Sequence, residues 1–444
     1  MRIGVIGGGA VGLTVAYRLA RRGAEVALIE KEPELGGLAA GFHPTDNPDL
    51  WLEKFYHHLF QTDKDIVALI DELGLSERLL WLRPNTSTIY HGEIAQLDSP
   101  TRVLLYKHLS VPSRLRLAAG LAYLKYLISD YHRLPKTTTA VWAERWMGSQ
   151  VYDMQWKPLL EGKFHQFAPE IALPWFWSRV KCRTTKLGYV KGGFQHVYNR
   201  LGEEIRKAGG TIRLGTGVDR IAPVEGGKVA IDVAGQREVY DAVVATLPTR
   251  LFLRLTDGLP DDYRRQYDWG QALGAQVLIL ALDRPFMPPV YWLNVNDPGY
   301  PFLIACEHTN MMPAADYGGQ HLLYLGNYLP MDHPYLKLTG EQLMAEFLPH
   351  LTKINPAFDR AWVQRHWMFQ APFAQPVVTM DFAAHIAPLE TPIPNLYLAN
   401  MFQVYPQDRG QNYSVRLGNQ LAERIRLPPA AAPAPAAPVG AGAP

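Results

Sequence analysis

The first forty residues constrain the fold of this chain more than any other stretch. Residues Arg2–Ile6 form a short apolar run, typical of a strand buried on both faces of a parallel sheet. Three glycines follow directly in the spacing G-x-G-x-x-G. In this motif Gly7 permits a tight turn, Gly9 lets a pyrophosphate approach the backbone, and Gly12 allows a helix to pack closely on the strand.

The segment behind the glycines completes a strand–helix–strand unit. A helical pattern with Leu13, Ala16 and Leu19 on one face follows, and a second apolar strand, residues 25–29, closes on Glu30. The N–H groups at the start of such a helix bind phosphates, and an acid at the tip of the second strand accepts hydrogen bonds from ribose hydroxyls. The unit predicts a dinucleotide site, and Glu30 argues against a ribose 2′-phosphate. The alternative is a glycine-rich turn without a ligand.

The stretch past Glu30 indicates which dinucleotide is bound. It reads Glu34-Leu35-Gly36-Gly37-Leu38-Ala39-Ala40. This resembles the Gly-Gly segment of FAD proteins in the amine oxidase and protoporphyrinogen oxidase superfamily, which NAD dehydrogenases lack. Leu38 stands where the family usually has an Arg that contacts the pyrophosphate. The resemblance implies FAD held by the two glycines and by the residues beside both motifs, which are Ala10, Val11, Lys31 and Leu38.

Composition bounds the remaining possibilities. A chain of 444 residues buries a large core and is expected to hold two domains. Its net charge of +2 gives no reason to expect nucleic acid as a partner. Cys182 and Cys306 show neither metal-type spacing nor a disulfide framework, so a reducing cytosol is expected. Because the N-terminus enters a strand at once, no signal peptide is expected, and no stretch has the length of a transmembrane helix.

A pair of histidines follows the glycine segments. The pattern His58-x-Phe60-x-Thr62 leads into a capped amphipathic helix that begins after Asp63. The pattern is similar to the histidine loop of UDP-galactopyranose mutases, in which a His lies beside the flavin. The resemblance implies a flavin-facing role for His58 and, less directly, for His57. The alternative is a pair of structural histidines in an aromatic cluster.

Residues 96–184 have a helical pattern and no dinucleotide signal. This insertion is rich in tryptophan and is expected to form a helical cap over a substrate cavity. Within it, residues 112–127 combine leucines at helical spacing with Arg114, Arg116 and Lys125. A basic amphipathic helix of this kind can lie on a membrane surface. More commonly such a helix packs on its own domain and exposes its charges to water.

The chain then returns to the dinucleotide-binding part. Residues 187–221 resemble the second FAD segment of the superfamily, in which the residue at the place of Val218 holds the adenine through its backbone. Residues 241–248 match the strand that passes under the same cofactor. Alternating apolar strands between residues 266 and 384 predict an antiparallel or mixed sheet. Its aromatic and histidine residues belong either to a cavity wall or to the core: Trp292, Tyr300, His308, Tyr324, Tyr328 and Trp367.

The C-terminal part carries the last expected cofactor contacts. Asn400 follows a strand at residues 395–399, at the place where the superfamily has an acid that meets the ribityl–pyrophosphate region. It is an uncharged substitute that can still hydrogen-bond. Arg409 precedes a helix opened by Gly410, Asn412 and Tyr413, whose N–H groups are placed to stabilise negative charge on a flavin. The alternative is an ordinary capped helix start.

The predicted fold is α/β, with a Rossmann-type FAD-binding domain and its parallel sheet interleaved with a mixed-sheet and helical substrate domain. Residues 427–444 are a Pro/Ala-rich tail that is expected to be disordered. The FAD-binding domain is expected over residues 1–95, 185–265 and 385–426, and the substrate domain over residues 96–184 and 266–384.

Nearly the whole chain resembles the superfamily that includes protoporphyrinogen oxidases, phytoene desaturases, amine oxidases and UDP-galactopyranose mutases. The resemblance implies that non-covalently bound FAD oxidises an apolar or ring-containing small molecule, with His58 and Arg409 on opposite sides of the flavin. Neither cysteine lies near the C-terminal flavin segment, which argues against a thioether link. Amine oxidation is disfavoured because the substrate half lacks the Lys of flavin amine oxidases: none lies between Lys228 and Lys337 or after Lys353.

Two other functions stay open. One is a redox-neutral mutase that acts on a sugar nucleotide, which needs arginines in the cavity to bind a diphosphate. The other is a non-catalytic flavin-binding protein, which the departures at Leu38 and Asn400 favour. The chain has no second G-x-G-x-x-G motif for NADH, so electrons are expected to pass to oxygen, a quinone or a partner protein. The expected location is the cytoplasm, or a membrane surface contacted through residues 112–127.

Overall fold

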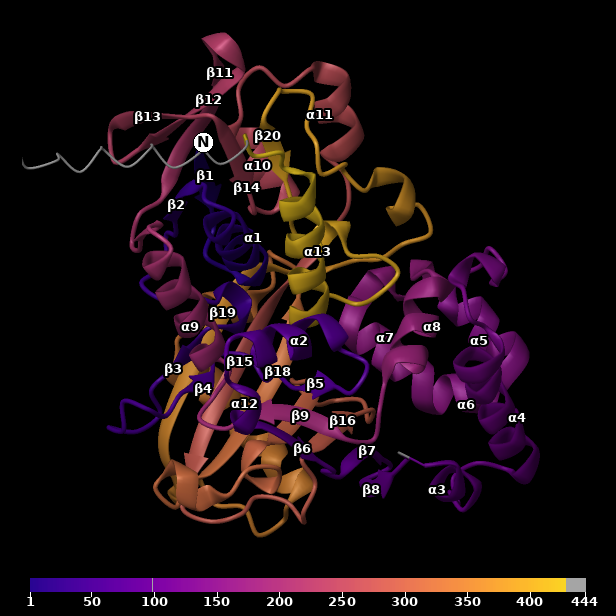
Figure 1. Cartoon of the computed structure of the whole chain (residues 1–444). Coiled ribbons are helices and arrows are strands. Elements are labelled where there is room, and N and C mark those ends of the chain that lie inside the picture. The colour runs from indigo at the N-terminus through magenta and orange to yellow at the C-terminus, as the bar shows by residue number, and fades with distance from the viewer. Residues whose placement is uncertain (98, 429–444) are drawn as a thin grey trace, which may run out of the picture.

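The computed structural model describes residues 1–97 and 99–428. The expectation of a disordered tail therefore falls, from residue 429 onward, outside the described residues. The first layer is a five-stranded sheet in which every neighbouring pair is parallel and β1 is central (Figure 1). In order across the sheet, its strands are β10 (Thr211–Arg213), β2 (Glu25–Ile29), β1 (Arg2–Ile6), β14 (Ala242–Ala245) and β20 (Leu396–Leu398).

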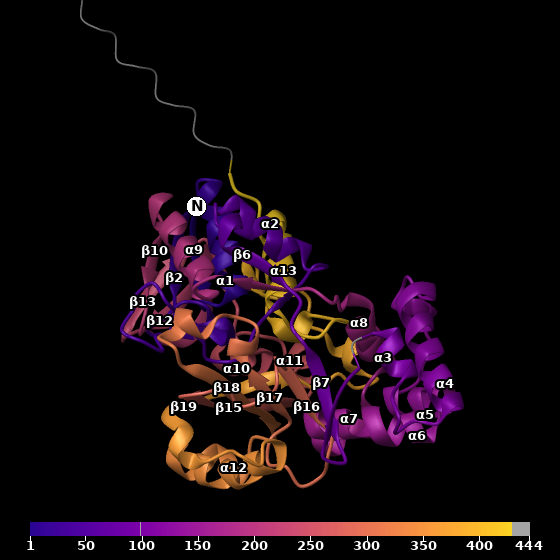
Figure 2. The ribbon, with the colours of Figure 1, turned by 90° about the horizontal axis from the view of Figure 1, so that it is seen from below.

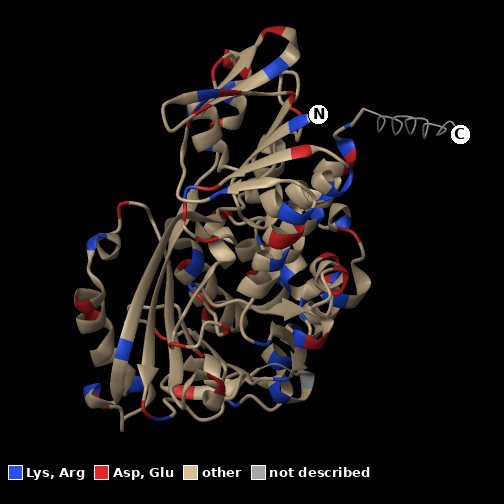
Figure 3. Ribbon diagram, turned by 60° about the vertical axis from the view of Figure 1, so that its left-hand side comes forward, with Lys and Arg blue, Asp and Glu red and all other residues tan. Residues whose placement is uncertain are grey.

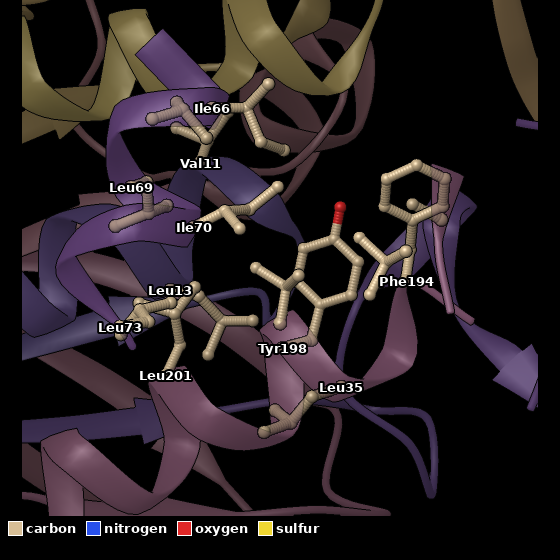
Figure 4. Close-up of a cluster of buried hydrophobic side chains, with 14 of the residues drawn as sticks. Val11, Leu13, Leu35, Ile66, Leu69, Ile70, Leu73, Phe194, Tyr198 and Leu201 are labelled. Carbon is tan, nitrogen blue, oxygen red and sulfur yellow. The ribbon is translucent and has the colours of Figure 1, made fainter. Parts of the chain in front are cut away.

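Both faces of this sheet are covered, as its continuous apolar strands require. Ile3 and Val5 of β1 face a helical layer in which α1 lies beside α13, and Figure 4 shows α1, α2 and α9 contributing leucine, isoleucine and valine side chains to one cluster. The opposite face, with Ile6, packs on a small antiparallel sheet and two short helices. These elements are α1 (Ala10–Arg21), α2 (Lys64–Glu72), α9 (Gln195–Lys207), α13 (Gln411–Arg424), β11 (Val218–Val224), β12 (Lys228–Val233), β13 (Gln236–Tyr240), α10 (Thr249–Leu255) and α11 (Asp261–Tyr267).

The second sheet is mixed and has seven strands, and Figure 3 shows how few charged residues its long strands carry. One face packs on the nucleotide-binding part, and the other is covered by α12 (Gly340–Ile354) (Figure 2). Its strands β7 and β8 come from the segment expected to belong to the first part of the FAD-binding domain. Across the sheet the order is β19 (Val363–Pro376), β15 (Ala272–Leu282), β18 (His321–Leu329), β17 (Ile304–Glu307), β16 (Trp292–Val295), β7 (Thr86–Tyr90) and β8 (Glu93–Gln96).

The insertion forms a helical unit beside the second sheet, with its own buried core built around Trp142, Phe164 and Trp175 (Figures 1 and 2). The return of the chain, β9 (Leu187–Val190), pairs with β5 (Leu59–Phe60) and β6 (Leu79–Leu82), which brings it beside the histidine loop. A two-stranded sheet of β3 (Gly41–Phe42) and β4 (Leu52–Glu53) lies before that loop. The helices of the unit are α3 (Pro100–Leu104), α4 (Val111–Ala122), α5 (Thr139–Met147), α6 (Ser149–Val151), α7 (Lys157–Phe164) and α8 (Leu173–Cys182).

The predicted fold class is confirmed: a nucleotide-binding parallel sheet is interleaved with a mixed sheet and a helical insertion. The packing of β1 against α1 explains the glycine spacing. A Cβ at Gly12 would lie 2.0 Å from the carbonyl oxygen of Gly7, and one at Gly7 would lie 2.3 Å from the Thr246 hydroxyl. The helix approaches the strand so closely that only glycine fits at this contact.

We expect Gly12→Ala to lower the free energy of unfolding by about 2–3 kcal/mol, because a backbone oxygen cannot move away as a flexible side chain does. The matched control is Gly217→Ala, since Gly217 is exposed and a Cβ there meets nothing within 4 Å. Urea unfolding of both variants measures the difference. Equal stability of the two variants would contradict the close approach of α1 to β1.

Candidate functional site

The glycine turn brings two segments together at the carboxyl end of β1. Gly7 adopts φ = +105° and Gly36 adopts φ = +113°, and the Gly36 N–H donates to the Gly8 carbonyl over 2.8 Å. Gly9 precedes α1, whose N-terminus has no side-chain cap. A Cβ at Gly9 would meet nothing closer than Gly37, at 3.9 Å. The first N–H groups of α1 are therefore open to a phosphate.

The other N-terminal candidates surround this turn. Glu30 is buried at the tip of β2, where its carboxylate accepts hydrogen bonds from the Gly8 N–H at 2.5 Å and the Glu32 N–H at 2.8 Å. Lys31 beside it is exposed and pairs with Glu32 at 3.2 Å. Ala10 and Val11 form the first turn of α1, and Leu38 lies in a short 3-10 helix, Gly37–Ala39.

Two later candidates have different surroundings. Val218 begins β11, two residues after Thr216, whose N–H donates to the Glu30 carbonyl over 2.9 Å. The Asn400 side chain is buried, donates to the Leu247 carbonyl at 2.8 Å and accepts from the Phe402 N–H at 2.9 Å. Its amide therefore holds the loop after β20 in place through contacts within the protein.

A cavity of about 220 Å³ lies where the three parts of the molecule meet. Its walls come from the histidine loop, from α7 and α8 of the helical unit, from strands of the second sheet, and from the start of α13. The structure thus brings His57 and His58 to the same cavity as Arg409, although some 350 positions separate them. Gly410, Asn412 and Tyr413 also line it. Their roles toward a flavin stay predictions.

Both histidines are neutral at ordinary pH. His58 Nδ1 lies 3.2 Å from the Tyr291 hydroxyl, and His57 Nδ1 lies 2.6 Å from the Phe55 carbonyl. Burial, together with the positive charge of Arg183, lowers the pKa of His58 to about 3, and burial beside Arg409 lowers the pKa of His57 to about 4. Among the described residues, His58 Nε2 has no hydrogen-bond partner, so a neutral imidazole nitrogen is available to a bound molecule.

The cavity wall carries an excess of positive charge. Lys163, Arg179, Arg183 and Arg409 line it beside two carboxylates, Asp63 and Asp408. Asp408 accepts from Lys163 at 2.9 Å and from Arg179 at 2.5 Å. Burial alone would raise the pKa of Asp408, but the positive charges of Lys163, Arg179 and Arg409 hold it well below its usual range. The four cations therefore exceed the carboxylates by two.

Arg183 is the cation without a protein partner. Among the described residues, its guanidinium makes no hydrogen bond or ion pair, although it lies in the cavity wall at the end of α8. Burial and the neighbouring Arg179 lower the pKa of Arg183 to about 9, so it remains protonated at neutral pH. A buried cation without a partner is costly, and an anionic ligand would remove that cost.

Tyr328 joins the second sheet to this cluster. Its hydroxyl accepts a hydrogen bond from Arg409 Nη2 at 2.9 Å, and the Lys163 ammonium lies 4.8 Å from the centre of its ring. Burial alone would raise the pKa of Tyr328, but Arg409 and Lys163 together lower it below its usual value. Tyr328 is therefore the tyrosine of the cavity most ready to release a proton.

The start of α13 offers donors that the protein leaves unused. Arg409 Nε, Gln411 Nε2 and Asn412 Nδ2 are buried and have no hydrogen-bond partner within residues 1–97 and 99–428. Asn412 Oδ1 is occupied, since it accepts from the Asp65 and Ile66 N–H groups. Three unused donors beside a helix N-terminus fit the acceptor atoms of an isoalloxazine, so the residues present suit a flavin here.

One argument from the sequence is wrong. Cys182 is far from the C-terminal segment along the chain, but it lines the cavity and its thiol contacts the Tyr413 hydroxyl. The packing of α8 against the start of α13 brings the two together. Distance along the chain therefore gives no argument against a thioether.

Sequence reasoning missed the basic cluster. Lys163, Arg179 and Arg183 are ordinary basic residues in a helical insertion, and only their packing against Asp408 distinguishes them. Of the aromatic and histidine residues considered in the second sheet, Trp292 and Tyr328 line the cavity. The absence of Lys from that stretch of sequence stands, yet Lys163 reaches the cavity from α7.

Comparisons with known proteins place this geometry in context. The family model described as flavin containing amine oxidoreductase matches residues 11–406. A protein named "Putative protoporphyrinogen oxidase" from Exiguobacterium sp. 255-15 aligns over 95% of this chain and 98% of its own, with a TM-score of 0.76 and 18% identity. Reduced UDP-galactopyranose mutase aligns over 95% of both chains, with a TM-score of 0.74 and 17% identity.

A third solved structure has a similar fold. Cyclohexylamine oxidase from Brevibacterium oxydans IH-35A aligns over 95% of this chain and 98% of its own, with a TM-score of 0.73 and 16% identity. No curated protein matches the sequence. At these identities the solved structures share the fold with this chain, and their substrates differ from one another.

We expect Asp408→Asn to lower the free energy of unfolding by about 3–5 kcal/mol, because it leaves Lys163 and Arg179 buried without a counter-charge. Adding Lys163→Met to this variant should recover part of the loss by removing one unpaired cation. Urea unfolding at pH 7 measures both.

The control for this prediction is Asp232→Asn, which breaks an exposed pair with Arg237 and should leave the unfolding free energy nearly unchanged. If Asp408→Asn behaved like this control, the buried charge balance would not hold the cavity together.

Proposed function

The chain belongs to the flavin-containing amine oxidoreductase family, and from this premise we propose that it binds FAD without a covalent link and oxidises a small, ring-containing molecule that bears an anionic group. The observation that carries the proposal is the cavity wall, in which four cations face two carboxylates and the Arg183 guanidinium lacks a partner in the described part of the chain. Bound FAD would supply the two-electron chemistry. The protein supplies binding, orientation and charge.

The residues that would hold the cofactor divide by chemistry. The N-terminus of α1, with Gly7, Gly9 and Gly12, suits a pyrophosphate, and Glu30 suits ribose hydroxyls. The unused donors of Arg409, Gln411 and Asn412 suit the acceptor atoms of the flavin ring. In the cavity, Phe60, Trp292 and Tyr328 offer ring surfaces against which a planar substrate packs.

The charge of the cavity disfavours the substrate class in the family name. A protonated amine would enter a site that already has two excess positive charges and would be repelled. The one cavity lysine, Lys163, is committed to Asp408. A carboxylate or phosphate group, by contrast, would give Arg183 the partner it lacks.

Tyr328 is our candidate for proton transfer during oxidation. Removal of a hydride equivalent from a substrate is accompanied by loss of a proton. Tyr328 would relay this proton as a phenol, or receive it as a phenolate, which Arg409 and Lys163 favour by lowering its pKa. His58 would act as a neutral hydrogen-bonding group beside the flavin, because burial keeps its pKa at about 3. Electrons would then pass to oxygen, a quinone or a partner protein.

A redox-neutral mutase is the second candidate, and the arginines of the cavity favour it, since a sugar nucleotide carries a diphosphate. It would work only with reduced flavin and would consume no electron acceptor. Anaerobic assays with dithionite separate the two functions: conversion of UDP-galactopyranose without an acceptor would favour the mutase. A bound flavin that no candidate compound reduces, and that supports no conversion, would favour a non-catalytic role.

We expect Arg183→Gln to raise the KM for an anionic substrate roughly 10- to 100-fold while changing kcat less. Loss of a charge-assisted hydrogen bond costs about 1.5–3 kcal/mol of binding. The substrate is found by screening carboxylates and phosphates for anaerobic bleaching of the flavin, followed by steady-state kinetics. Arg250→Gln is the control, because Arg250 is half-exposed and pairs with Asp268 on the surface. Equal KM values for the two variants would overturn the anionic substrate.

We expect purified protein to be yellow and to release its flavin on acid precipitation. His58→Ala should alter the visible spectrum or the reduction rate of that flavin and leave FAD affinity nearly unchanged, because the contacts from Gly7 to Glu30 dominate binding. Rapid-mixing reduction and an FAD titration measure the two quantities. Because the pKa of His58 is about 3, we expect the flavin reduction rate to show no titration of His58 between pH 5 and 8. An unchanged spectrum and rate would remove His58 from the flavin environment.

A further inference from the structure

The outer edge of the helical unit has an unusual surface. Of the twelve large apolar side chains that are exposed in the described part of the chain, eight lie between Leu104 and Trp146. Figures 1 and 2 both show α4 at the outer side of this unit, away from α1 and the parallel sheet. A concentration of this kind marks an interaction surface rather than the scattered apolar residues of an ordinary exterior.

The exposed face of α4 is mostly apolar. Its buried side carries Leu117 and Gly120, and Leu124 is buried in the helical turn Tyr123–Leu127 that follows α4. On the exposed face, apolar residues recur at helical spacing: Val111, Leu115, Ala119 and Ala122, followed by Tyr126 in the helical turn Tyr123–Leu127 beyond α4. Arg116 is also exposed, and its guanidinium donates to the Arg145 and Trp146 carbonyls. An ordinary surface helix shows mainly charged or polar residues on its exposed face. Val111 is 62% exposed, Leu115 56% and Tyr126 74%.

Neighbouring helices extend this face. Arg114 donates to the Leu104 carbonyl at 2.8 Å, which holds the end of α3 and its exposed residues Leu104 and Leu105 beside α4. Arg116 donates to the Trp146 carbonyl at 3.1 Å, which holds the 61% exposed Trp146 at the other side. We call these residues, from α3, α4 and the end of α5, the α4 surface.

The charged side chains of residues 99–128, which include α3 and α4, are all basic. Residues 99–128 contain five Lys and Arg residues and no Asp or Glu. Some of these cations bind carbonyls at helix ends, and Lys107 and His108 pair with Glu93 of β8. Even so, the segment remains positive. Leucine, valine, tryptophan and tyrosine in a basic setting match the boundary between anionic lipid headgroups and acyl chains.

We propose that the α4 surface docks on a bilayer that contains anionic lipid. The absence of acidic residues from residues 99–128 favours lipid over a second copy of the chain, whose own α4 surface is positive and would repel it. No helix among the described residues is both long and apolar enough to cross a bilayer. Docking would therefore bury side chains only at the interface.

The same segment is tied to the cavity. Lys125 donates to the Val180 and Arg183 carbonyls, and Lys181 donates to the Lys125 and Ile128 carbonyls. Residues 125–128 are thus hydrogen-bonded to the end of α8, which carries the cavity residues Arg179, Cys182 and Arg183. Docking would hold this wall of the cavity next to the lipid.

The test is flotation of the full-length protein with vesicles. We expect binding to vesicles of 70% phosphatidylcholine and 30% phosphatidylglycerol at 0.1 M salt, and at least tenfold weaker binding at 0.5 M salt or to pure phosphatidylcholine. Leu115→Glu combined with Tyr126→Glu should weaken binding at least tenfold. Val239→Glu is the control, since Val239 is exposed on β13, outside the α4 surface.

Other outcomes would overturn the proposal. Wild-type protein that remains in the bottom fraction with anionic vesicles would do so. A concentration-dependent dimer that the Leu115/Tyr126 variant abolishes, without vesicle binding, would assign the surface to a second copy. Equal vesicle binding by the Leu115→Glu/Tyr126→Glu variant and by the Val239→Glu control would place the lipid contact outside the α4 surface. Circular dichroism of both variants shows that a loss of binding is not a loss of folding.

Discussion

Asp408 is the point at which the three parts of the molecule are joined. Its carboxylate pairs with Lys163 of α7 and Arg179 of α8, and it accepts from Gln375 of β19 at 3.1 Å. The next residue, Arg409, donates to Tyr328 of β18. Buried ion pairs contribute to orientation more than to net stability. Two consecutive residues therefore connect both the helical unit and the second sheet to the start of α13.

A second polar centre shows what a purely structural network looks like. Glu53 of β4 is buried and accepts from the Phe194 N–H at 2.7 Å and the Tyr189 hydroxyl at 2.8 Å, and its carbonyl accepts from the Tyr324 hydroxyl of β18 at 2.8 Å. Burial raises the pKa of Glu53 to about 7. Both carboxylate oxygens of Glu53 have protein partners. At the cavity, Arg183 and the donors around Arg409 have no protein partner among the residues that the structure describes, and this contrast separates a ligand site from a structural contact.

The parts predictable from sequence are those that local chemistry determines. The turn from Gly7 to Gly12, the strand that ends at Glu30 and the helix start at Gly410 each follow from neighbouring residues. The basic cluster does not, because Lys163 and Arg179 meet Asp408 across 245 and 229 positions through packing alone. The same packing brings Cys182 to Tyr413. For the segment of α4, the leucine pattern predicts a helix but not which leucines are buried, because apolar residues occur on both sides: Leu117 is buried, whereas Leu115 is 56% exposed.

The cavity charge sets limits on the chemistry that this member of the family can perform. Burying four cations around two carboxylates is unfavourable in the absence of a ligand, and the lowered pKa of Arg183 reflects that cost. A positive field of this kind favours an anionic ligand, and it also favours whichever state of a bound cofactor carries more negative charge. Both effects act in the direction of accepting electrons from an anion, and both oppose the approach of an ammonium group. The fold alone does not set the substrate class; in this chain the charge of the cavity comes from side chains of the insertion and of the loop before α13.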